Sequence, residues 1–249
     1  MVKLDIISDP ICPWCYIGKS NFDKALADFP DHPFEIEWHP FQLNPDMPPE
    51  GMDRREYLEA KFGGKEGVVQ AYGPVVTHAE TAGVELNLDK IKKTPNTIDA
   101  HRLIHWAGLE QRQLLVVDLL FKAYFVEGRD ISDHEVLADI ADTAEMDASM
   151  VTRLLKTDSD IEDIRARDLH SRKMGIQSVP TFIVANQHAV PAPNRRKCGR
   201  RSSRKSKSSW IRRSDPTHPK TKPRRIYRAY GHAHRHGRVL HRRDVACAA

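Results

Sequence analysis

The sequence predicts an α/β protein in which a strand–helix–strand unit and a later helix–strand–strand unit are separated by a large, all-helical insertion. Three patterns predict this class. Apolar and polar residues alternate near residues 2–6 and 34–38, helical spacing fills residues 53–174, and an apolar, β-branched run follows the proline at position 180. At 249 residues the chain is long enough to bury a full hydrophobic core.

The first expected strand, near residues 2–6, leads directly into a pair of cysteines. Apolar residues then recur at helical spacing from Trp14 to Phe29, which predicts a helix over this segment. The motif Cys12-Pro13-Trp14-Cys15 therefore falls between a strand and a helix, at the N-terminus of that helix.

Two thiols three positions apart at a helix N-terminus are typical of a redox pair. Unpaired backbone N–H groups and the positive end of the helix dipole favour a thiolate, so we expect a lowered pKa for Cys12 and a nucleophilic side chain near neutral pH. Cys15, one turn further in and less exposed, is expected to resolve the mixed disulfide that Cys12 forms with a substrate sulfur. Pro13 and Trp14 are uncharged, so we expect them to tune the pair through backbone donors and packing.

A zinc site is the main alternative interpretation of a CxxC motif. It needs two further ligands at workable spacing. Only Cys198 and Cys247 remain, and each stands alone in a C-terminal segment of biased composition. We therefore expect no metal at this motif.

A second strand is expected at residues 34–40, followed by a connection without period at residues 44–51. Helical patterns then cover 55–62, 67–81, 97–109, 111–125, 133–144, 148–155 and 159–174. Asp133 or Ser132 is expected to cap the helix at 133–144, and Asp158 or Ser159 the last helix.

The final strands are expected around a proline. Pro180 cannot donate to a central sheet ladder, so it is expected at the first residue of a strand that continues to residue 184. Asn186-Gln187 resembles a tight turn, with a return strand at residues 188–190. One terminal helix is then missing from the set that would cover both faces of the sheet.

Charge divides the chain near residue 191. The overall net charge is +5, but residues 191–249 hold 19 Lys and Arg against two acidic residues, a net of +17, and residues 1–190 hold 20 against 32, a net of −12. The first 190 residues thus look like an ordinary acidic cytoplasmic protein. No leader pattern or long apolar run predicts secretion or membrane insertion.

Four segments together resemble the thioredoxin-fold oxidoreductases of the DsbA type, within them the FrnE-like branch. They are residues 3–18 around the CxxC motif, the strand end at 38–41, the helix start at 96–102 and the segment 175–182. The resemblance covers about residues 2–190. It implies a discontinuous thioredoxin-like domain, residues 1–43 and 159–190, interrupted by a helical domain, residues 44–158, that covers the active site.

The same resemblance implies roles for individual residues. Cys12 and Cys15 are the redox pair, and the resemblance implies that Pro180 is cis and lies against their disulfide. It also implies that the Val179 backbone pairs with a substrate strand. No cofactor is expected, except glutathione as a co-substrate.

A sister branch is formed by the glutathione-dependent 2-hydroxychromene-2-carboxylate isomerases and the kappa-class glutathione transferases. These carry serine where this chain has Cys12, which favours redox chemistry here. The region of Asn96 and Arg102 is common to both branches, so it does not discriminate between them. The alternative for that region is a helix held by ordinary caps and ion pairs.

Two other groups are weaker candidates for chemistry. His101 and His105 lie four apart on a helix but lack a nearby carboxylate in a recognisable motif, which favours a helical-face pair over a metal site. Glu35 or Glu37 is a candidate proton relay near the buried thiol, although a solvated strand-face acid is the expected alternative.

The tail, residues 191–249, is expected to be disordered from its composition. It has two interpretations. As an evolved arm it would bind nucleic acid or another polyanion, with Tyr227 and Tyr230 able to stack on bases. We favour the interpretation that the tail is a frameshift product. One set of codons for residues 191–199 also encodes Gly-Ala-Gln-Pro-Thr-Glu-Met-Trp in another reading frame. The family that this chain resembles opens its final helix with such a Gly-Ala-Gln-Pro turn.

The sequence therefore predicts a cytoplasmic thiol-disulfide oxidoreductase acting on protein or small-molecule thiols and disulfides. A glutathione-dependent isomerase or transferase and, if the tail is genuine, a nucleic-acid-binding protein are the alternatives.

Overall fold

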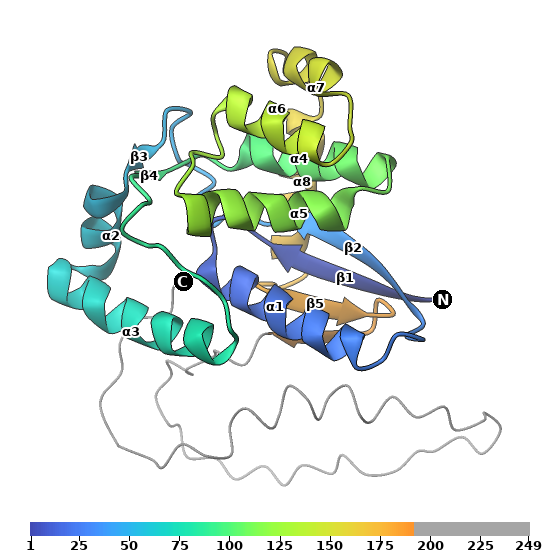
Figure 1. Cartoon of the computed structure of the whole chain (residues 1–249), viewed down its shortest axis with the longest axis horizontal. Helices are drawn as coiled ribbons and strands as arrows, with labels where there is room; N and C mark the ends of the chain where they lie inside the picture. Colours follow the sequence, from blue (N-terminus) through green and yellow to red (C-terminus); the bar gives the residue numbers. More distant parts are fainter. Residues whose placement is uncertain (192–249) are drawn as a thin grey trace, which may run out of the picture.

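The computed structural model describes residues 1–191, and all expectations for the rest of the tail, its disorder and frameshift origin included, lie outside those residues. Its central sheet has four strands in the order β2-β1-β5-β6 (Figure 1). Strand β1 (Val2–Ser8) pairs in parallel with β2 (Phe34–Pro40), and the antiparallel strands β5 (Thr181–Val184) and β6 (His188–Pro191) complete the sheet. The chain thus belongs to the expected mixed α/β class.

The helices of the first 191 residues lie mostly between β2 and β5 in sequence. Helix α1 (Pro13–Ala27) connects β1 to β2. A small two-stranded sheet follows, made of β3 (Met52–Asp53) and β4 (Lys93–Thr94), with the helices α2 (Arg54–Phe62) and α3 (Lys65–Thr81) between its strands.

The remaining helices form a second group above the sheet in Figure 1. They are α4 (Ile98–Leu109), α5 (Gln113–Phe121) with the π-helical turn η1 (Lys122–Glu127), α6 (His134–Thr143), α7 (Ala148–Leu155) and α8 (Ile161–Lys173). Helix α8 returns the chain to the sheet, as the helix–strand–strand prediction requires.

Strand register decides which side chains face which layer. Ile6 is paired with Trp38 and Phe182, so these three share one face, which α1 covers through a contact between Phe22 and Phe182 with ring centroids 5.6 Å apart. Asp5 is paired with Glu37 on the opposite face, where α8 packs against β2. Helix α1, which begins at the CxxC motif, and helix α8 therefore lie on opposite sides of the sheet.

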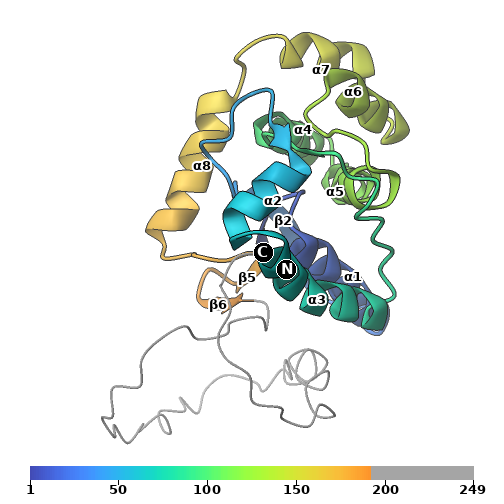
Figure 2. The same cartoon turned by 90° about the vertical axis from the view of Figure 1, so that its left-hand side faces the viewer.

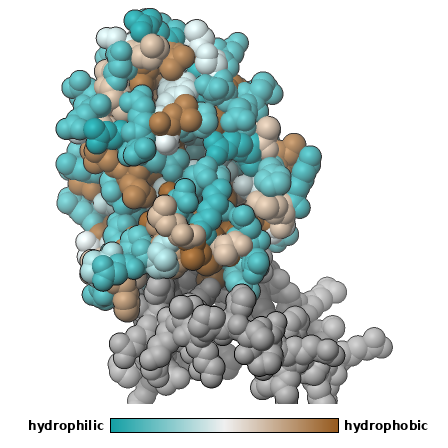
Figure 3. Space-filling model, turned by 90° about the vertical axis from the view of Figure 1, so that its right-hand side faces the viewer, coloured by the Kyte–Doolittle hydropathy of each residue, from teal (hydrophilic) through white to brown (hydrophobic). Residues whose placement is uncertain are grey.

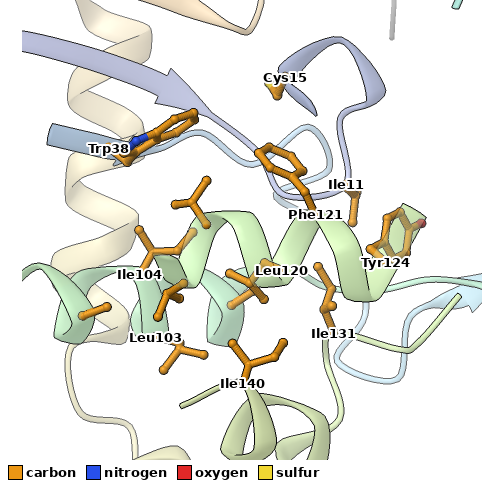
Figure 4. Packing of buried hydrophobic residues seen from close by; sticks show 14 of the residues in the cluster. Ile11, Cys15, Trp38, Leu103, Ile104, Leu120, Phe121, Tyr124, Ile131 and Ile140 are labelled. Carbon is orange, nitrogen blue, oxygen red and sulfur yellow. The ribbon is translucent and has the colours of Figure 1, made fainter. Parts of the chain in front are cut away.

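The core joins the sheet to the helical insertion without a break. Figure 4 shows Ile11, Trp38, Phe121 and Tyr124 packed together where α5 meets the end of β1. The same cluster contains Cys12 and Cys15. The face in Figure 3 is largely polar, with apolar residues scattered rather than gathered in one broad area.

Most expected elements are present, with local corrections. Helix α8 begins at Ile161, and its N-cap is Asp160 in the left-handed region at φ 62° without a side-chain capping bond, so the expected cap by Asp158 or Ser159 is wrong. Asp133 does cap α6, by accepting a bond from the Glu135 N–H at 2.9 Å. The final turn is centred on Ala185 and Asn186, one residue earlier than expected.

The two helical stretches 67–81 and 111–125 also differ from expectation in detail. Helix α3 continues through Pro74, and the expected helix 111–125 changes at residue 122 from α5 into the π-helical turn. No helix within residues 1–191 has an extensive contact with β6. The same residues contain no helix long and apolar enough to cross a membrane.

Candidate active site

Helix α1 places both cysteines at the end of β1. Cys12 is the N-cap residue, with extended backbone, and Pro13 opens the helix at its first position. The Cys12 carbonyl accepts the N–H of Cys15 at 3.0 Å and of Tyr16 at 3.2 Å, so the first turn is built on Cys12 itself. Proline suits this position because the first helical N–H groups have no partner within the helix.

Cys12 faces the loop before β5. Its Sγ lies 3.9 Å from the carbonyl oxygen of Val179, and the Val179–Pro180 peptide bond is cis, as the resemblance implies for Pro180. Pro180 also lies close behind the helix: a Cβ on Gly18 would come within 2.8 Å of Pro180 Cγ. The redox motif and a segment 167 residues away in the chain thus form one site.

Cys15 is fully buried. Burial, with the neighbouring Cys12 as the next cause, raises the pKa of the Cys15 thiol well above its ordinary value. The Ser8 hydroxyl and the Asp9 backbone N–H bond to it and act in the opposite direction. Cys15 is therefore held as a neutral thiol at neutral pH.

Both thiols are free and fully buried, so the expectation that Cys12 is the more exposed of the two is wrong. Helix α3 contributes to this enclosure. His78 meets the Trp14 ring edge-on with centroids 5.4 Å apart, and Ile17 packs with Val75 and Ala79. Figure 2 shows α3 lying beside α1, which agrees with the expected cover from the helical insertion.

A narrow groove beside the motif, with a free volume of about 10 Å³, has two basic residues in its lining. Pro13 and Ile11 line it together with residues of α2 and α3. Arg54 is buried there and donates to the hydroxyls of Tyr124 and Tyr72 at 2.8 and 2.9 Å, and no carboxylate within residues 1–191 pairs with it. Lys61, in the same groove, donates to the Tyr57 hydroxyl at 2.6 Å.

A family model supports the assignment of this fold. The model described as a DSBA-like thioredoxin domain matches residues 3–196, more than three quarters of the chain. The chain belongs to the DsbA-like thioredoxin domain family. Its sequence is also 28% identical over 187 residues to the protein YwbO of Bacillus subtilis, which covers 74% of this chain and 88% of YwbO.

Solved structures agree with the DsbA-like fold. A "probable DsbA oxidoreductase" from Streptomyces coelicolor is 28% identical, with a TM-score of 0.69, covering 77% of this chain and 83% of that one. A 2-hydroxychromene-2-carboxylate isomerase is 15% identical, with a TM-score of 0.59 and coverage of 76% and 88%. The cytosolic disulfide reductase DsbM from Pseudomonas aeruginosa, solved with GSH, is 18% identical, with a TM-score of 0.54 and coverage of 76% and 89%.

Other predicted residues of this DsbA-like domain lie away from the thiols. Glu37 pairs with Lys3 and Arg167, each at 3.0 Å, on the sheet face opposite α1, and Glu35 is exposed. The proposed relay through Glu35 or Glu37 is therefore wrong.

Asn96 and Arg102 have structural contacts. Arg102 is almost fully buried, pairs with Asp99 at 2.7 Å and donates to the carbonyl oxygens of Leu154, Thr157 and Ser159. Asn96 donates to the Met47 carbonyl at 2.6 Å. These contacts favour the alternative of ordinary caps and ion pairs.

The histidine pair does not share a site. His105 Nδ1 faces Arg167 Nη1 at 3.0 Å, and His101 points to the buried carboxylate of Asp9, with Nε2 3.9 Å from Oδ1. Within residues 1–191 the group with metal-like spacing is Asp5, Glu37 and His39. Both of its carboxylates already pair with Lys3, so it is an ion-pair network.

The buried pair of Asp9 and His101 was not predicted from the sequence, which offered His101 only as one of a histidine pair. Burial raises the pKa of Asp9 to about 7, against hydrogen bonds from the N–H groups of Leu43 and Ile11, and burial lowers the pKa of His101 to about 4. Asp9 precedes Cys12 by three positions, and that proximity was the available signal. His101 has no such signal, because it approaches from α4.

Proposed function

We propose that this DsbA-like protein exchanges thiols and disulfides through Cys12 and Cys15. The proposal rests mainly on two free thiols at the N-terminus of α1. The sulfur of Cys12 lies 3.9 Å from the carbonyl oxygen of Val179, next to the cis Pro180. Family membership supports oxidoreductase or related enzyme activity in general. The specific pairing of Cys12 with Cys15 is our proposal.

The exchange takes two steps. The Cys12 thiolate attacks one sulfur of a substrate disulfide, a bond forms between them, and the substrate S–S bond breaks with its electron pair on the second sulfur, which takes up a proton. Cys15, after losing its proton, attacks Cys12 Sγ. The Cys12–Cys15 disulfide forms and the substrate leaves as its second thiol, so the protein loses two electrons and the substrate gains them.

The different environments of the thiols set the order of attack. Cys12 is the N-cap residue of α1 and its sulfur faces the Val179 carbonyl, where we propose that the substrate binds. The raised pKa of Cys15 keeps that thiol protonated until the mixed disulfide has formed. Run in reverse, the same two steps oxidise a substrate dithiol.

Residues around the thiols are proposed to hold the substrate. The Val179 backbone would pair with an extended substrate segment, as the resemblance implies, with Pro180 against the sulfur atoms. Pro13 and Trp14 shape the surface beside the pair, since Pro13 lines the groove and Trp14 is held by His78. Because Cys12 is fully buried, side chains around it must shift before a substrate sulfur can reach it.

The charge of the groove supports a small anionic thiol as one substrate. Arg54 has no carboxylate in a salt bridge with it within residues 1–191, and glutathione carries two carboxylates. We propose glutathione as a co-substrate and no other cofactor; the groove, with a free volume of about 10 Å³, must widen before a glutathione carboxylate can approach the buried Arg54. DsbM, solved with GSH, is a fold neighbour in keeping with this. We also propose a cytoplasmic location.

Exchange kinetics test the function. The full chain is mixed with a peptide disulfide, and both the reduced peptide and the covalent adducts are measured. Cys12→Ser should abolish exchange, whereas Cys15→Ser should accumulate the Cys12 mixed disulfide. Exchange by the Cys12→Ser protein at the rate of the unaltered protein would overturn the proposal.

A second arm of the experiment addresses the alternative. The serine that replaces Cys12 in the glutathione-dependent isomerases and transferases argues against that chemistry here. Turnover that requires glutathione and survives Cys15→Ser unchanged would favour the isomerase or transferase function instead.

A further inference from the structure

Residues 41–43 connect the end of β2 to the groove beside the thiols. Leu43 lines that groove together with Pro13, the residue that follows Cys12. The sulfur of Cys12 in turn faces the Val179 carbonyl. A substrate that extends on both sides of its disulfide would therefore meet two segments of the protein, the connection after β2 and the loop before β5.

The backbone of this connection is held from three directions. Residues beyond the end of a strand have no ladder partner, so their buried N–H groups need others. The N–H of Phe41 donates to the Ser8 carbonyl at 3.1 Å, and the N–H of Leu43 donates to Asp9 Oδ2 at 2.7 Å. Gln42 lies between them and is 4% exposed. Its backbone is held by neither of these groups but by helix α8.

Two side chains of α8 bind both backbone groups of Gln42. Asp168 Oδ1 accepts the Gln42 N–H at 2.8 Å, and Arg172 Nη2 donates to the Gln42 carbonyl. The guanidinium carbon of Arg172 also lies 4.2 Å from the centre of the Phe41 ring. An ion pair within one helix usually turns its remaining polar atoms to water, whereas this pair uses them to hold another segment.

The ion pair has a fixed geometry. Arg172 Nε and Nη2 donate to the two carboxylate oxygens of Asp168 at 2.7 and 3.1 Å. Such a two-point arrangement fixes the relative orientation of both side chains. Asp168 is only 6% exposed, and an ion pair of this kind gains little stability because its carboxylate loses water. What distinguishes the pair is therefore the position that it imposes on residues 41–43.

The same end of α8 leads into the loop that faces Cys12. The Arg172 carbonyl accepts the Gly175 N–H at 2.9 Å, and the Ser171 carbonyl accepts the next N–H, that of Ile176, at 3.3 Å. Figure 2 shows α8 running down to this turn and on to β5. The side chain of Arg172 thus holds the connection after β2, while its carbonyl holds the start of the loop before β5.

We propose that Asp168 and Arg172 form a clamp that fixes the connection after β2 relative to the loop before β5, and so determines the affinity for extended peptide disulfides. The inference rests on the proposed exchange through Cys12 and Cys15. Because α8 lies on the sheet face opposite α1, the clamp acts through the backbone of these two segments, and both of its members are positioning residues. A compact disulfide, which reaches Cys12 without contacting both segments, does not depend on the clamp.

Single-turnover exchange with two disulfides separates affinity from chemistry. An excess of the reduced full chain is mixed with an uncharged linear peptide whose two cysteines form a disulfide, and the peptide thiols are measured over time. Arg172→Met should raise the half-saturating protein concentration about tenfold, because misplaced binding groups weaken binding far from the reacting atoms. The limiting rate should stay within about twofold, the signature of lost binding rather than lost chemistry. The rate with bis(2-hydroxyethyl) disulfide should also stay within about twofold, which shows that the variant is folded.

Matched variants keep the test specific. Arg172→Lys keeps the charge but lacks the planar fork that binds Asp168 and Gln42 together, so it should behave as Arg172→Met does. Arg165→Met, which removes an exposed pair with Glu162 on the same helix, should change neither reaction.

Two results would overturn the clamp. One is an equal loss with both disulfides in Arg172→Met, which would indicate a general structural effect. The other is an Arg172→Lys protein that binds the peptide as the unaltered protein does, which would mean that charge alone matters. Failure of the exchange proposal itself looks different, because the unaltered protein would then reduce neither disulfide.

Discussion

Gly18 and Pro180 are in close approach across the redox site: a Cβ built on Gly18 would lie 2.8 Å from Pro180 Cγ. Contacts this short are not tolerated, so either the helix or the Pro180 loop must move if position 18 gains a side chain. The loop also carries the Val179 carbonyl that faces Cys12 Sγ. Gly18 is therefore a positioning residue, one helical turn beyond Cys15.

Gly18→Ala is expected to destabilise the protein and slow exchange. Overpacking costs about 1–3 kcal/mol, whereas alanine in place of glycine inside a helix gains about 1 kcal/mol. Urea unfolding and exchange rates of Gly18→Ala and the unaltered protein decide the matter. A Gly18→Ala protein that is more stable than the unaltered protein would show that Pro180 exerts no steric limit on position 18.

Asp9 should make folding stability fall as pH rises from about 4 to about 7. Burial raises its pKa from 3.8 to about 7, so in this window the folded protein binds more protons at this site than the unfolded chain does. The contribution is fully present below the unfolded pKa and is lost as pH rises through the folded pKa. His101, with its pKa lowered to about 4, acts in the opposite sense, so the wild-type curve alone is not diagnostic.

The difference between the unaltered protein and Asp9→Asn isolates this term. The free energy of unfolding of the unaltered protein, relative to Asp9→Asn, should decline across pH 4–7. A difference for Asp9→Asn that rises with pH would mean that the folded protein favours the carboxylate.

Arg102 should matter for stability rather than for exchange. Arg102→Met removes a buried guanidinium and leaves Asp99 and three carbonyl groups without their donor, a loss of about 3–5 kcal/mol. Arg165→Met, at an exposed pair with Glu162, should cost less than about 1 kcal/mol. Thermal unfolding compares the two. If the Arg102→Met protein unfolds like the unaltered protein yet loses exchange, the residue has a functional role that its contacts do not suggest.

The basic tail is expected to bind polyanions without sequence preference, whatever its origin. Its net charge of +17 over residues 191–249 predicts an affinity for DNA that falls steeply with salt through counterion release. A chain ending after Pro191 should lose this binding and keep thiol exchange. Fluorescence anisotropy with unrelated DNA sequences measures the first, and retention of DNA affinity by the shortened chain would place the binding elsewhere.

The strands and helices that were predicted correctly are those whose burial pattern repeats within a few residues of the sequence. The alternation in β1 and β2 and the helical period of α1 come from burial on one face, which is visible within a few residues. The strands β3 and β4 have two residues each, too few to show an alternation of apolar and polar residues. Their pairing, Met52 with Thr94, joins segments far apart in the sequence. Asp160 starts α8 from a left-handed conformation, which side-chain capping rules do not anticipate.

The residues of the active site also fall into two groups, those with a local sequence signal and those without one. Cys12 and Cys15 are recognisable because their spacing is local, and Pro180 because it precedes a strand. The approach of His101 to Asp9 depends on how α4 packs on the end of β1, 92 positions earlier in the chain. Likewise, Arg54 reads as one basic residue among many until the fold places two tyrosine hydroxyls and no carboxylate around it.

A redox titration shows whether Cys12 and Cys15 exchange electrons as a pair. The full chain is equilibrated in a series of glutathione redox buffers, remaining thiols are alkylated, and each cysteine is quantified by mass spectrometry. We expect Cys12 and Cys15 to lose alkylation together in one two-electron transition, with a disulfide-linked peptide containing both. If either cysteine stays alkylated while the other is oxidised, or both stay reduced across the whole series, the account of this site as a dithiol–disulfide pair is wrong.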